Sequence, residues 1–561
     1  MTTSIIVPPA LVMIAAGLLL PFVRGAARPA ALLLPPLVTL WLIWILPEGA
    51  QLQLPFLGYE LTVAKVDKLS RLFALVFAIM SFAGALFALH QSRTLELSAA
   101  FVYAGSAIGA VMAGDLITLF VFWELMAVGS TIVVFCGGKG AQHAAFRYAV
   151  LHLLGGVLLM AGIAGEIQAA GSVAFGKMDT STPARWLILA GFLINAGAPP
   201  LSAWLPDAYP QSSWSGMVFL SAFTTKTAVY VLIRGFPGTE VLIWVGLFMV
   251  FYGIVYAILE NDMRRILAYS IVNQVGFMVV GVGIGTEMAL NGASAHAFTH
   301  IIYKALLLAS AGSVLLMTGK SKCTDLGGLF RTMPLTCICG IVGALAISSF
   351  PLTSGFISKS MIAEGAAGQH LMWVWLALAA ASAGVFLHAG IKFPWFVFFQ
   401  KDSGLRPAEP PGNMQAAMLL LAALCIGLGI LPGPLYALLP YDVAYVPYTV
   451  PHVLFQLQLL LFSGLAFFLL LPLLKRTLTI TLDVDWFWRR AGRELLRGLD
   501  DASGRAWDAF TRALHGAVRA LTQGLYATLG PAGALGRPWP TGRMAFWTML
   551  MLGAYLIAAY L

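Results

Sequence analysis

Long apolar runs recur along almost the whole chain, with short polar connections between them. A helix needs about 20 mostly apolar residues to cross the hydrocarbon core of a bilayer. Runs of roughly this length lie near residues 4–24, 30–46, 68–90, 97–113, 114–135, 144–169, 184–200, 213–234, 238–259, 265–285, 290–318, 334–362, 370–399, 414–439, 452–474 and 544–561. We therefore predict an all-α polytopic membrane protein with about 16 transmembrane helices.

Two of the apolar runs are interrupted by Gly and Pro residues, in Gly191 to Pro200 and in Phe350 to Lys359. The two interruptions are five spans apart. Broken helices in corresponding positions of two halves are typical of an inverted repeat with an ion path near the membrane midplane. We therefore expect two inverted repeats.

The segment after the fifteenth span has a different pattern. It contains no spanning run, but an apolar stripe recurs at helical spacing with arginines off it. We expect an amphipathic helix along the membrane surface; the alternative is an ordinary cytoplasmic tail whose helical fragments are interrupted by glycines. The stripe consists of Trp507, Phe510, Leu514, Val518, Leu521 and Leu525, the arginines are Arg505, Arg512 and Arg519, and the glycines are Gly492, Gly498, Gly504 and Gly516.

These patterns predict six segments along the chain. A polar, proline-containing break, Lys401 to Gly412, separates the closely spaced spans from those that follow. The expected segments are N-terminal helices in 1–96, a first repeat in 97–235, a second repeat in 236–400, two further spans in 401–475, the amphipathic surface segment in 476–543 and a final span in 544–561.

Composition and charge support a membrane location. Of the 561 residues, 60% are hydrophobic and only 10% are charged, whereas soluble domains have about 25% charged residues. The first residues include no basic region and no small-residue cleavage site, so we expect the first span to be retained. The net charge of +9 does not indicate nucleic-acid binding, because the spans leave no solvent-exposed domain to carry it. We expect the lipid bilayer of the cell inner membrane as the surroundings.

The basic residues are concentrated in the loops that follow odd-numbered spans. Cytoplasmic loops are enriched in Lys and Arg, so both termini are predicted on the non-cytoplasmic side. The basic loops hold Arg24, Arg28, Arg93, Lys139, Arg147, Arg264, Arg265, Lys320, Lys322, Arg331, Lys401, Arg406, Lys475 and Arg476.

The five cysteines indicate no metal or redox chemistry. They form no Cys-x-x-Cys pair, and Cys337 and Cys339 lie inside an apolar run. We interpret them as inert core thiols. No set of metal, haem or iron–sulfur ligands is visible, so we expect neither a metal nor a cofactor.

Three titratable residues, His296, His300 and Lys304, recur every four positions in the middle of an apolar run, Asn291 to Met317. On a helix they form one polar file about 12 Å long. Lys304 lies about 20 Å from either end of the run, beyond the reach of a snorkelling side chain. A lysine at mid-membrane costs roughly 2.5 to 3.5 kcal/mol on insertion scales. The file therefore predicts a functional proton relay.

Two more charges are predicted deep in the membrane. Glu124 lies about ten residues from either end of its span, too far from water for an unpaired carboxylate. Lys226, from another span, is the natural partner. A buried pair whose protonation states respond to each other can pass a proton on, although a structural salt bridge is the alternative.

Lys359, which follows the second broken run, and the pair His388 and Lys392 complete the candidate residues. Lys392 is close to the end of its span, so snorkelling and a relay role are both open. Four intramembrane charges, Glu124, Lys226, Lys304 and Lys359, would together cost roughly 10 to 14 kcal/mol. Neutral imidazoles between them can both accept and donate protons, so we predict a transmembrane chain of titratable groups.

The motifs that surround these residues resemble a known family, the antiporter-like subunits of Mrp-type multisubunit cation/proton antiporters, respiratory complex I and membrane-bound hydrogenases. The resemblance extends from about residue 65 to 400 and is strongest to the D-type component of the Mrp antiporters. Its motifs are Phe122 to Met126, Pro200 to Ala208, Lys226 to Tyr230, Asn261 to Ser270, His296 to Gly312 and Gly355 to Lys359.

The resemblance implies about fourteen core helices with two inverted five-helix repeats. It implies that Glu124 is the acid of the fifth span and Lys226 the bridging lysine of the eighth. The α-helical file from His296 to Lys304 would be the central relay, and Lys359 the lysine of the broken twelfth helix. The C-terminal segment is similar to the lateral helix of the largest such subunit in complex I.

One position departs from the family pattern. Asn195 stands where the family usually has a lysine in its broken seventh helix, and an amide cannot titrate. The couple between Glu124 and that lysine is therefore incomplete. Either Lys226 or His152 substitutes for the lysine, or the first half-channel is altered.

Three functions fit the resemblance. The first is a proton-translocating subunit of a multisubunit antiporter that exchanges a monovalent cation, Na+, for H+, with other membrane subunits as partners. The second is a proton-pumping subunit of a redox-driven complex, such as a complex I-type NADH-quinone oxidoreductase or a membrane-bound hydrogenase. The third is a membrane partner that couples proton-motive force to inorganic-carbon uptake. In the first case the chain is a transporter subunit and not an enzyme.

Overall fold

The structure, a computed structural model, describes residues 7–138, 140–474 and 482–561. It separates into two compact units, Met1–Val484 and Asp485–Leu561. Both units are helical, and one two-stranded sheet is the only sheet among the described residues. The predicted all-α polytopic fold is confirmed.

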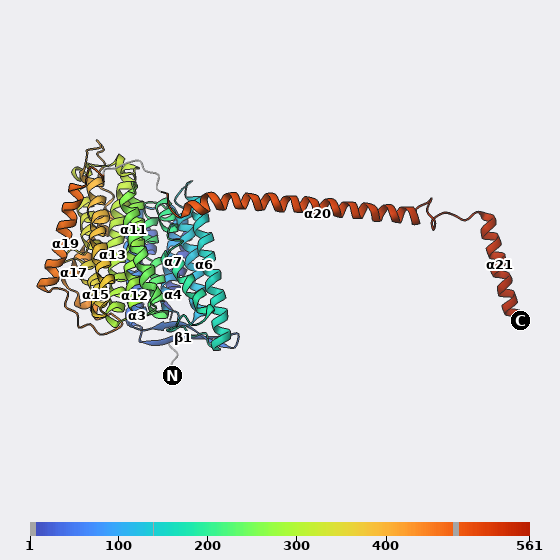
Figure 1. The fold of residues 1–561 in the computed structure, drawn as a ribbon, viewed down its shortest axis with the longest axis horizontal. Helices are drawn as coiled ribbons and strands as arrows, with labels where there is room; N and C mark the ends of the chain where they lie inside the picture. The colour runs from blue at the N-terminus through green and yellow to red at the C-terminus, as the bar shows by residue number, and fades with distance from the viewer. Residues whose placement is uncertain (1–6, 139, 475–481) are drawn as a thin grey trace. The chain divides into compact units, whose positions relative to one another are not determined.

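The first unit consists of helices that lie side by side (Figure 1). Its first part comprises α1 Pro9–Leu19, α2 Arg28–Ile45, α3 Lys68–Phe87, α4 Thr94–Met112, α5 Leu116–Phe135, α6 Ala141–Ala170, α7 Pro183–Ala196, α8 Trp204–Ala208, α9 Gly216–Leu220 and α10 Thr224–Gly235. The second part comprises α11 Val241–Leu259, α12 Met263–Ile284, α13 Glu287–Thr318, α14 Pro334–Ile347, α15 Ser354–Gly368, α16 Met372–Val385, α17 Gly412–Ile430, α18 Gly433–Tyr436 and α19 Val450–Leu469.

Every predicted span has a helical counterpart. Within the described ranges, thirteen helical segments are long and apolar enough to cross a membrane, and three shorter apolar segments, Pro9–Phe22, Pro183–Ala196 and Pro334–Ile347, account for the remainder. Short 3-10 turns extend several helix ends, at Leu20–Phe22, Gly25–Ala27, Ala88–His90, Tyr209–Gln211, Cys323–Asp325 and Leu329–Arg331.

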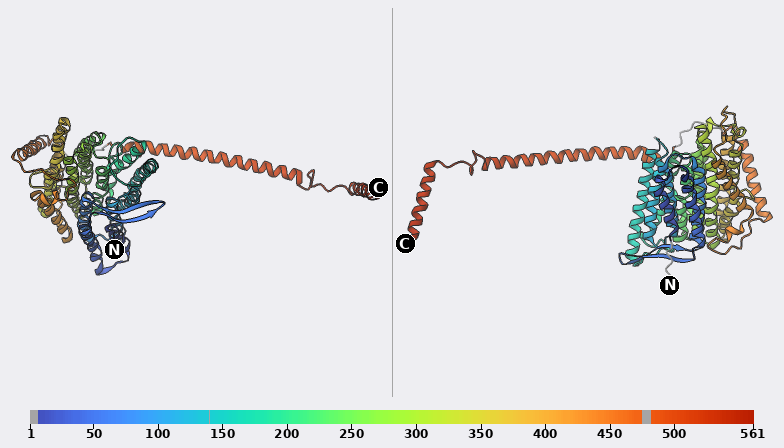
Figure 2. Two further views of the ribbon diagram at one scale, coloured as in Figure 1. Left: turned by 90° about the horizontal axis from the view of Figure 1, so that it is seen from below. Right: turned by 180° about the vertical axis from the view of Figure 1, so that it is seen from behind.

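A β-hairpin is an element that the hydrophobic pattern does not predict. Strands β1 Gly49–Phe56 and β2 Tyr59–Val66 pair antiparallel. Both turn residues, Leu57 and Gly58, have positive φ, of 48° and 84°, as a two-residue hairpin turn requires. The hairpin lies at one end of the helices of the first unit in Figure 1 and in the right-hand view of Figure 2.

Both predicted interruptions are present as broken helices. α7 begins with Pro183 and ends at Gly197, whose φ of 78° is the left-handed conformation that commonly ends a helix. α14 also begins with a proline, and the connection to α15 holds Ser349 and Leu352 at φ of 58° and 67°. Such a conformation costs a non-glycine residue roughly 1–2 kcal/mol, so the surrounding packing must hold this break in place.

The centre of the unit is formed by α10, α12 and α13. The apolar windows of the segments that contain α10 and α12 are completely buried, and α13 is buried at every position from Ala289 to Val314. Peripheral helices instead expose large apolar side chains, such as Trp41 and Trp44 on α2, as lipid contact requires. Any titratable side chain on α10, α12 or α13 therefore lies in the protein interior.

The second unit contains α20 Gly492–Leu529 and α21 Thr541–Tyr560, with a π-helical turn, Phe487–Ala491, before α20. α20 is a continuous helix of 38 residues. It passes through Gly498, Gly504 and Gly516 without a break, so the alternative of separate helical fragments is wrong. Its position along the membrane surface stays a prediction.

Candidate functional site

The predicted file on α13 is completely buried. His296, His300 and Lys304 are each 0% exposed. The rings of His296 and His300 have their centroids 6.2 Å apart, so successive members of the file lie one helical turn from each other. The spacing in the sequence therefore produces a compact row of titratable groups in the interior.

His296 is held by hydrogen bonds from two other helices. Its Nδ1 lies 3.1 Å from Ser358 Oγ on α15, and its Nε2 lies 3.0 Å from Gln274 Oε1 on α12. Tyr303 OH donates to the same Gln274 oxygen at 3.1 Å, and Thr299 Oγ1 lies 2.9 Å from Ser358 Oγ. This imidazole is the positioned member of the file.

His300 and Lys304 differ from His296 in their hydrogen bonding. Among the described residues, neither ring nitrogen of His300 nor the Nζ atom of Lys304 has a hydrogen-bond partner, although all three atoms are buried. A buried polar group without a partner costs roughly 1–3 kcal/mol, and a charged one more. At these two positions of the file, hydrogen bonds among the described residues do not offset that cost.

Sequence reasoning missed the residues that hold His296. Gln274, Tyr303, Thr299 and Ser358 are uncharged and lie inside apolar runs. The available signal was the pair of amides Asn273 and Gln274 in the middle of α12, because an amide in an apolar span needs a polar partner. The identity of that partner could not be read from the sequence.

Lys359 lies on α15 at the edge of this cluster. Its ammonium donates to Ile347 O at 3.1 Å, across the break between α14 and α15. It also lies 4.7 Å from the centroid of the Phe277 ring, a cation–π distance. The Phe277 ring has its centroid 6.4 Å from that of His296, so the broken helix places a cation on an aromatic ring that neighbours the hydrogen-bonded histidine.

A cavity of about 620 Å³ begins at Lys359. Ser360 and Glu364 line it from α15, and His452 and Gln456 line it from α19. At about 30 Å³ per molecule, it could hold roughly 20 waters. Lys359 is therefore a candidate residue that lines a cavity large enough for water.

The expected ion pair between Glu124 and Lys226 is not formed. Lys226, 0% exposed, donates instead to Ser221 O at 2.6 Å and to Thr225 Oγ1 at 3.1 Å, both close to it in the chain. Glu124 Oε1 has no hydrogen-bond partner among the described residues. Its carboxylate lies against α6 at Gly156, where a Cβ would overlap Oε1.

Asn195 is paired with a histidine. The Oδ1 atom of this amide lies 2.7 Å from Nδ1 of His152 on α6, and both side chains are buried. Of the two substitutes that the sequence suggests for the missing lysine, the structure brings His152 and not Lys226 into contact with Asn195.

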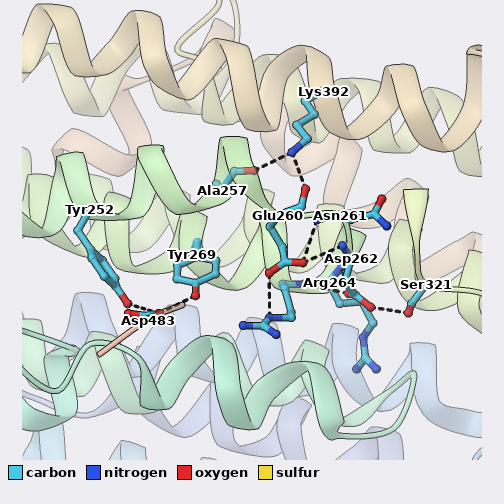
Figure 3. Close-up of polar contacts among 11 residues, drawn as sticks. Tyr252, Ala257, Glu260, Asn261, Asp262, Arg264, Tyr269, Ser321, Lys392 and Asp483 are labelled. Atoms are coloured by element: carbon cyan, nitrogen blue, oxygen red, sulfur yellow. Dashed lines mark hydrogen bonds and ion pairs between the residues drawn. The ribbon is translucent and has the colours of Figure 1, made fainter. Parts of the chain in front are cut away.

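His388 and Lys392 lie in a π-helical stretch, Phe386–Lys392. His388 Nδ1 lies 2.9 Å from Gly384 O in its own helix. Lys392 Nζ donates to the carbonyl oxygens of Ala257 at 3.1 Å and of Glu260 at 2.5 Å, at the end of α11 (Figure 3). It also donates to the carbonyl oxygen of Ile258 at 2.5 Å. A cation at the negative end of a helix stabilises it.

Further polar contacts surround the end of α11. The Glu260 carboxylate forms an ion pair with Arg265 at 3.1 Å. The Asp262 carboxylate accepts from the backbone N–H of Arg264 at 2.8 Å and from Ser321 Oγ (Figure 3). Asp262 thus caps the start of α12, and the cluster joins α11 to α12.

Asp483 ties the end of the first unit to α11 and α12. Its Oδ2 accepts from Tyr252 OH at 2.7 Å and from Tyr269 OH at 2.6 Å (Figure 3). Two hydroxyl donors to one carboxylate form a strong anchor.

No group of three or more His, Cys, Asp or Glu side chains is arranged to hold a metal ion within the described ranges. The features above define a polytopic membrane protein with a row of buried titratable side chains through its centre.

The comparisons with known proteins agree with this class. Residues 113–386 match the family described as NADH:quinone oxidoreductase/Mrp antiporter, TM. The D component of the Na(+)/H(+) antiporter of Alkalihalophilus pseudofirmus is 30% identical over 350 residues, which cover 58% of this chain and 71% of that protein. The chain therefore belongs to the NADH:quinone oxidoreductase/Mrp antiporter family, and the resemblance read from its motifs is confirmed.

An NADH-quinone oxidoreductase component and a chain of a respiratory membrane complex are also similar. The N component of the NADH-quinone oxidoreductase of Desulforudis audaxviator is 29% identical over 355 residues, which cover 58% of this chain and 70% of that protein. A chain of the membrane-bound sulfane sulfur reductase, an archaeal respiratory membrane complex, has a TM-score of 0.71 at 22% identity, over 98% of this chain and 99% of that chain. The second likeness concerns the fold alone.

Proposed function

We propose that the chain is the proton-translocating membrane subunit of a multisubunit Na+/H+ antiporter in the cell inner membrane. The observation that carries the proposal is the pair His300 and Lys304, which are completely buried and unpartnered among the described residues. Insertion of the lysine alone costs roughly 2.5–3.5 kcal/mol, and no hydrogen bond to its ammonium among the described residues offsets this cost. Proton transfer is a role that such groups can serve.

In this proposal the protons move along the row of candidate residues. Glu124 and Lys226 form the first half, and α10, which bears Lys226, packs against α13. The file from Lys304 to His296 forms the centre. Lys359 receives protons next to His296 and releases them into the cavity that it lines. Neutral imidazole can accept and donate protons near pH 7, so the histidines connect the lysines.

The test measures proton flux in vesicles that contain the chain with its native partner subunits. An imposed Na+ gradient should drive proton movement, and Glu124→Gln and Lys226→Ala should each abolish it because they remove a titrating group. Lys320→Ala, at an exposed loop position, is the matched control. Near-normal exchange in either site variant, at equal amounts of assembled protein, would contradict the proposal.

The second candidate function is a proton pump driven by a redox module. The observation that favours it is the likeness to the sulfane sulfur reductase chain, which extends over 98% of this chain and so includes most of the C-terminal unit. Co-purifying subunits separate the two candidates. Redox subunits, with proton uptake that needs an electron donor and no Na+, would select the pump over the antiporter.

A further inference from the structure

His152 lies in a closed aromatic and amide environment between α6, α7 and α8. It is 2% exposed. Its ring centroid is 4.0 Å from that of Tyr148 and 4.8 Å from that of Trp204. Trp204 is fixed in turn by a hydrogen bond from Nε1 to Ile194 O at 2.9 Å. These contacts hold the imidazole in one orientation.

The contact with Asn195 determines which ring nitrogen carries the proton. An amide oxygen only accepts hydrogen bonds. Because Asn195 Oδ1 lies 2.7 Å from Nδ1, Nδ1 must be the donor, and the neutral ring then has a lone pair on Nε2. Nε2 has no partner among the described residues and is buried. His152 therefore presents an open proton acceptor in the interior.

Glu124 is on the same side of α6. Its carboxylate lies against Gly156, which is four residues, or about 6 Å of helix, from His152. The other charged groups on the elements packed against α6 are already paired, because Arg185 on α7 binds Glu166 at 2.9 Å and Asp207 on α8 binds Arg147 at 2.7 Å. Glu124 is thus the charged residue left to exchange a proton with His152.

We propose that His152 is a proton carrier of the first half of the path and that Asn195 is its positioning residue. The inference rests on the proposed function, since it names a proton-carrying group of the proposed path. In the forward step the O–H bond of protonated Glu124 breaks and an Nε2–H bond forms, directly after side-chain movement or through water. The products are a carboxylate and an imidazolium, and the reverse transfer restores both groups.

The first test reads the tautomer by 15N NMR of the histidine-labelled complex in lipid, with the His152 signals assigned by their loss in His152→Gln. We expect protonated Nδ1 and bare Nε2 at alkaline pH. In Asn195→Leu, which removes the acceptor, the two tautomers should mix. Protonated Nε2 in the wild-type complex would overturn the proposal, whether or not the complex transports protons.

The second test measures proton flux per assembled complex. His152→Gln should lower it by about 10² or more, the usual contribution of one acid–base group. His143→Gln, at an exposed position of the same helix, is the matched control and should leave flux unchanged. Asn195→Lys, added to His152→Gln, restores a titrating group and should recover part of the flux.

The outcomes separate the two proposals. Wild-type flux in His152→Gln, at equal thermal stability, would overturn the role of His152 while leaving the proposed transport intact. Absence of proton flux in the wild-type complex would contradict the proposed function instead, and the NMR result would still decide the orientation of His152. A loss of stability in His152→Gln without loss of flux per folded molecule would show a purely structural histidine.

Discussion

Gly156 is the position at which a minimal change should disturb the path without removing a titrating group. A Cβ at this position would lie 2.8 Å from Glu124 Cδ and 3.1 Å from Oε2, and it would overlap Oε1. The neighbouring residue, Gly155, offers a matched control on the same helix. Its Cβ would lie 3.4 Å from a methyl group of Ile194 and 3.6 Å from Asn195 Oδ1, which are ordinary van der Waals contacts that displace neither group.

The expected effect of Gly156→Ala differs between transport and stability. The overlapping group is the end of a flexible side chain, so the carboxylate can rotate away, and the stability cost should stay below the roughly 1–3 kcal/mol of an overpacked core. The same rotation moves the carboxylate by about 1 Å from its place beside α6. A misplacement of that size can lower the rate of a positioned transfer by about 10²-fold.

Proton flux and thermal unfolding of the reconstituted complex test this expectation together. Gly156→Ala should lose most of its flux per folded molecule while its unfolding temperature changes little, and Gly155→Ala should resemble the wild type in both. Equal flux in the two alanine variants would refute the reasoning, because the carboxylate position beside Gly156 would then be irrelevant to transport.

Three further changes have defined outcomes. The double change His296→Ala with His300→Ala should strongly slow proton flux without unfolding the subunit, and unchanged flux per folded molecule would refute the relay. Lys392→Met should lower the unfolding temperature, because buried carbonyls that lose their donor cost roughly 1–3 kcal/mol, whereas the proton flux per folded molecule should be affected less. Scanning calorimetry beside the flux assay checks this. Burial raises the pKa of Asp67, but the Arg234 guanidinium and hydrogen bonds outweigh this effect and hold the pKa below its ordinary 3.8. The contribution of Asp67 to stability is therefore present above about pH 4 and is lost as the pH falls through the lower pKa of the folded state. The unfolding temperature of Asp67→Asn should therefore fall less between pH 5 and 3 than that of the wild type.

The sequence predicts the spans well because each spanning helix must be apolar over about 20 residues. The two broken helices can also be predicted from the sequence, because Gly and Pro interrupt an apolar run only where other groups support the backbone. The hairpin at Gly49–Phe56 and Tyr59–Val66 is short and lies between two spans. Its alternating pattern is therefore much weaker than the long apolar runs on either side, and the strands are not predicted.

Contacts between residues on different helices are harder to predict from the sequence. Helical spacing places His296, His300 and Lys304 on one face, and the structure agrees. Helical spacing does not specify which residue on another helix faces Glu124 or Lys226, and the expected ion pair between these two residues is absent from the structure. The pairing of Asn195 with His152 depends on the packing of α6 against α7, which no local pattern encodes.

The type of helix also decides which side chains a spacing of four residues brings together. His388 and Lys392 are four residues apart, a spacing that brings side chains together in an α-helix. The structure has a π-helix there, in which the repeat is longer, and Lys392 reaches the end of α11 instead. A π-helix has no clear sequence signal, so this outcome could not be predicted.

The central claim is that protons cross the subunit through the buried file of α13, and Lys304→Met tests it most directly. Methionine keeps the length and apolar character of the lysine stem but cannot carry a proton. Removing an unpartnered buried ammonium should leave the unfolding temperature unchanged or raise it, while ion-driven proton flux per assembled complex should vanish. Flux at the wild-type level in Lys304→Met vesicles, with the full set of partner subunits present, would contradict the account.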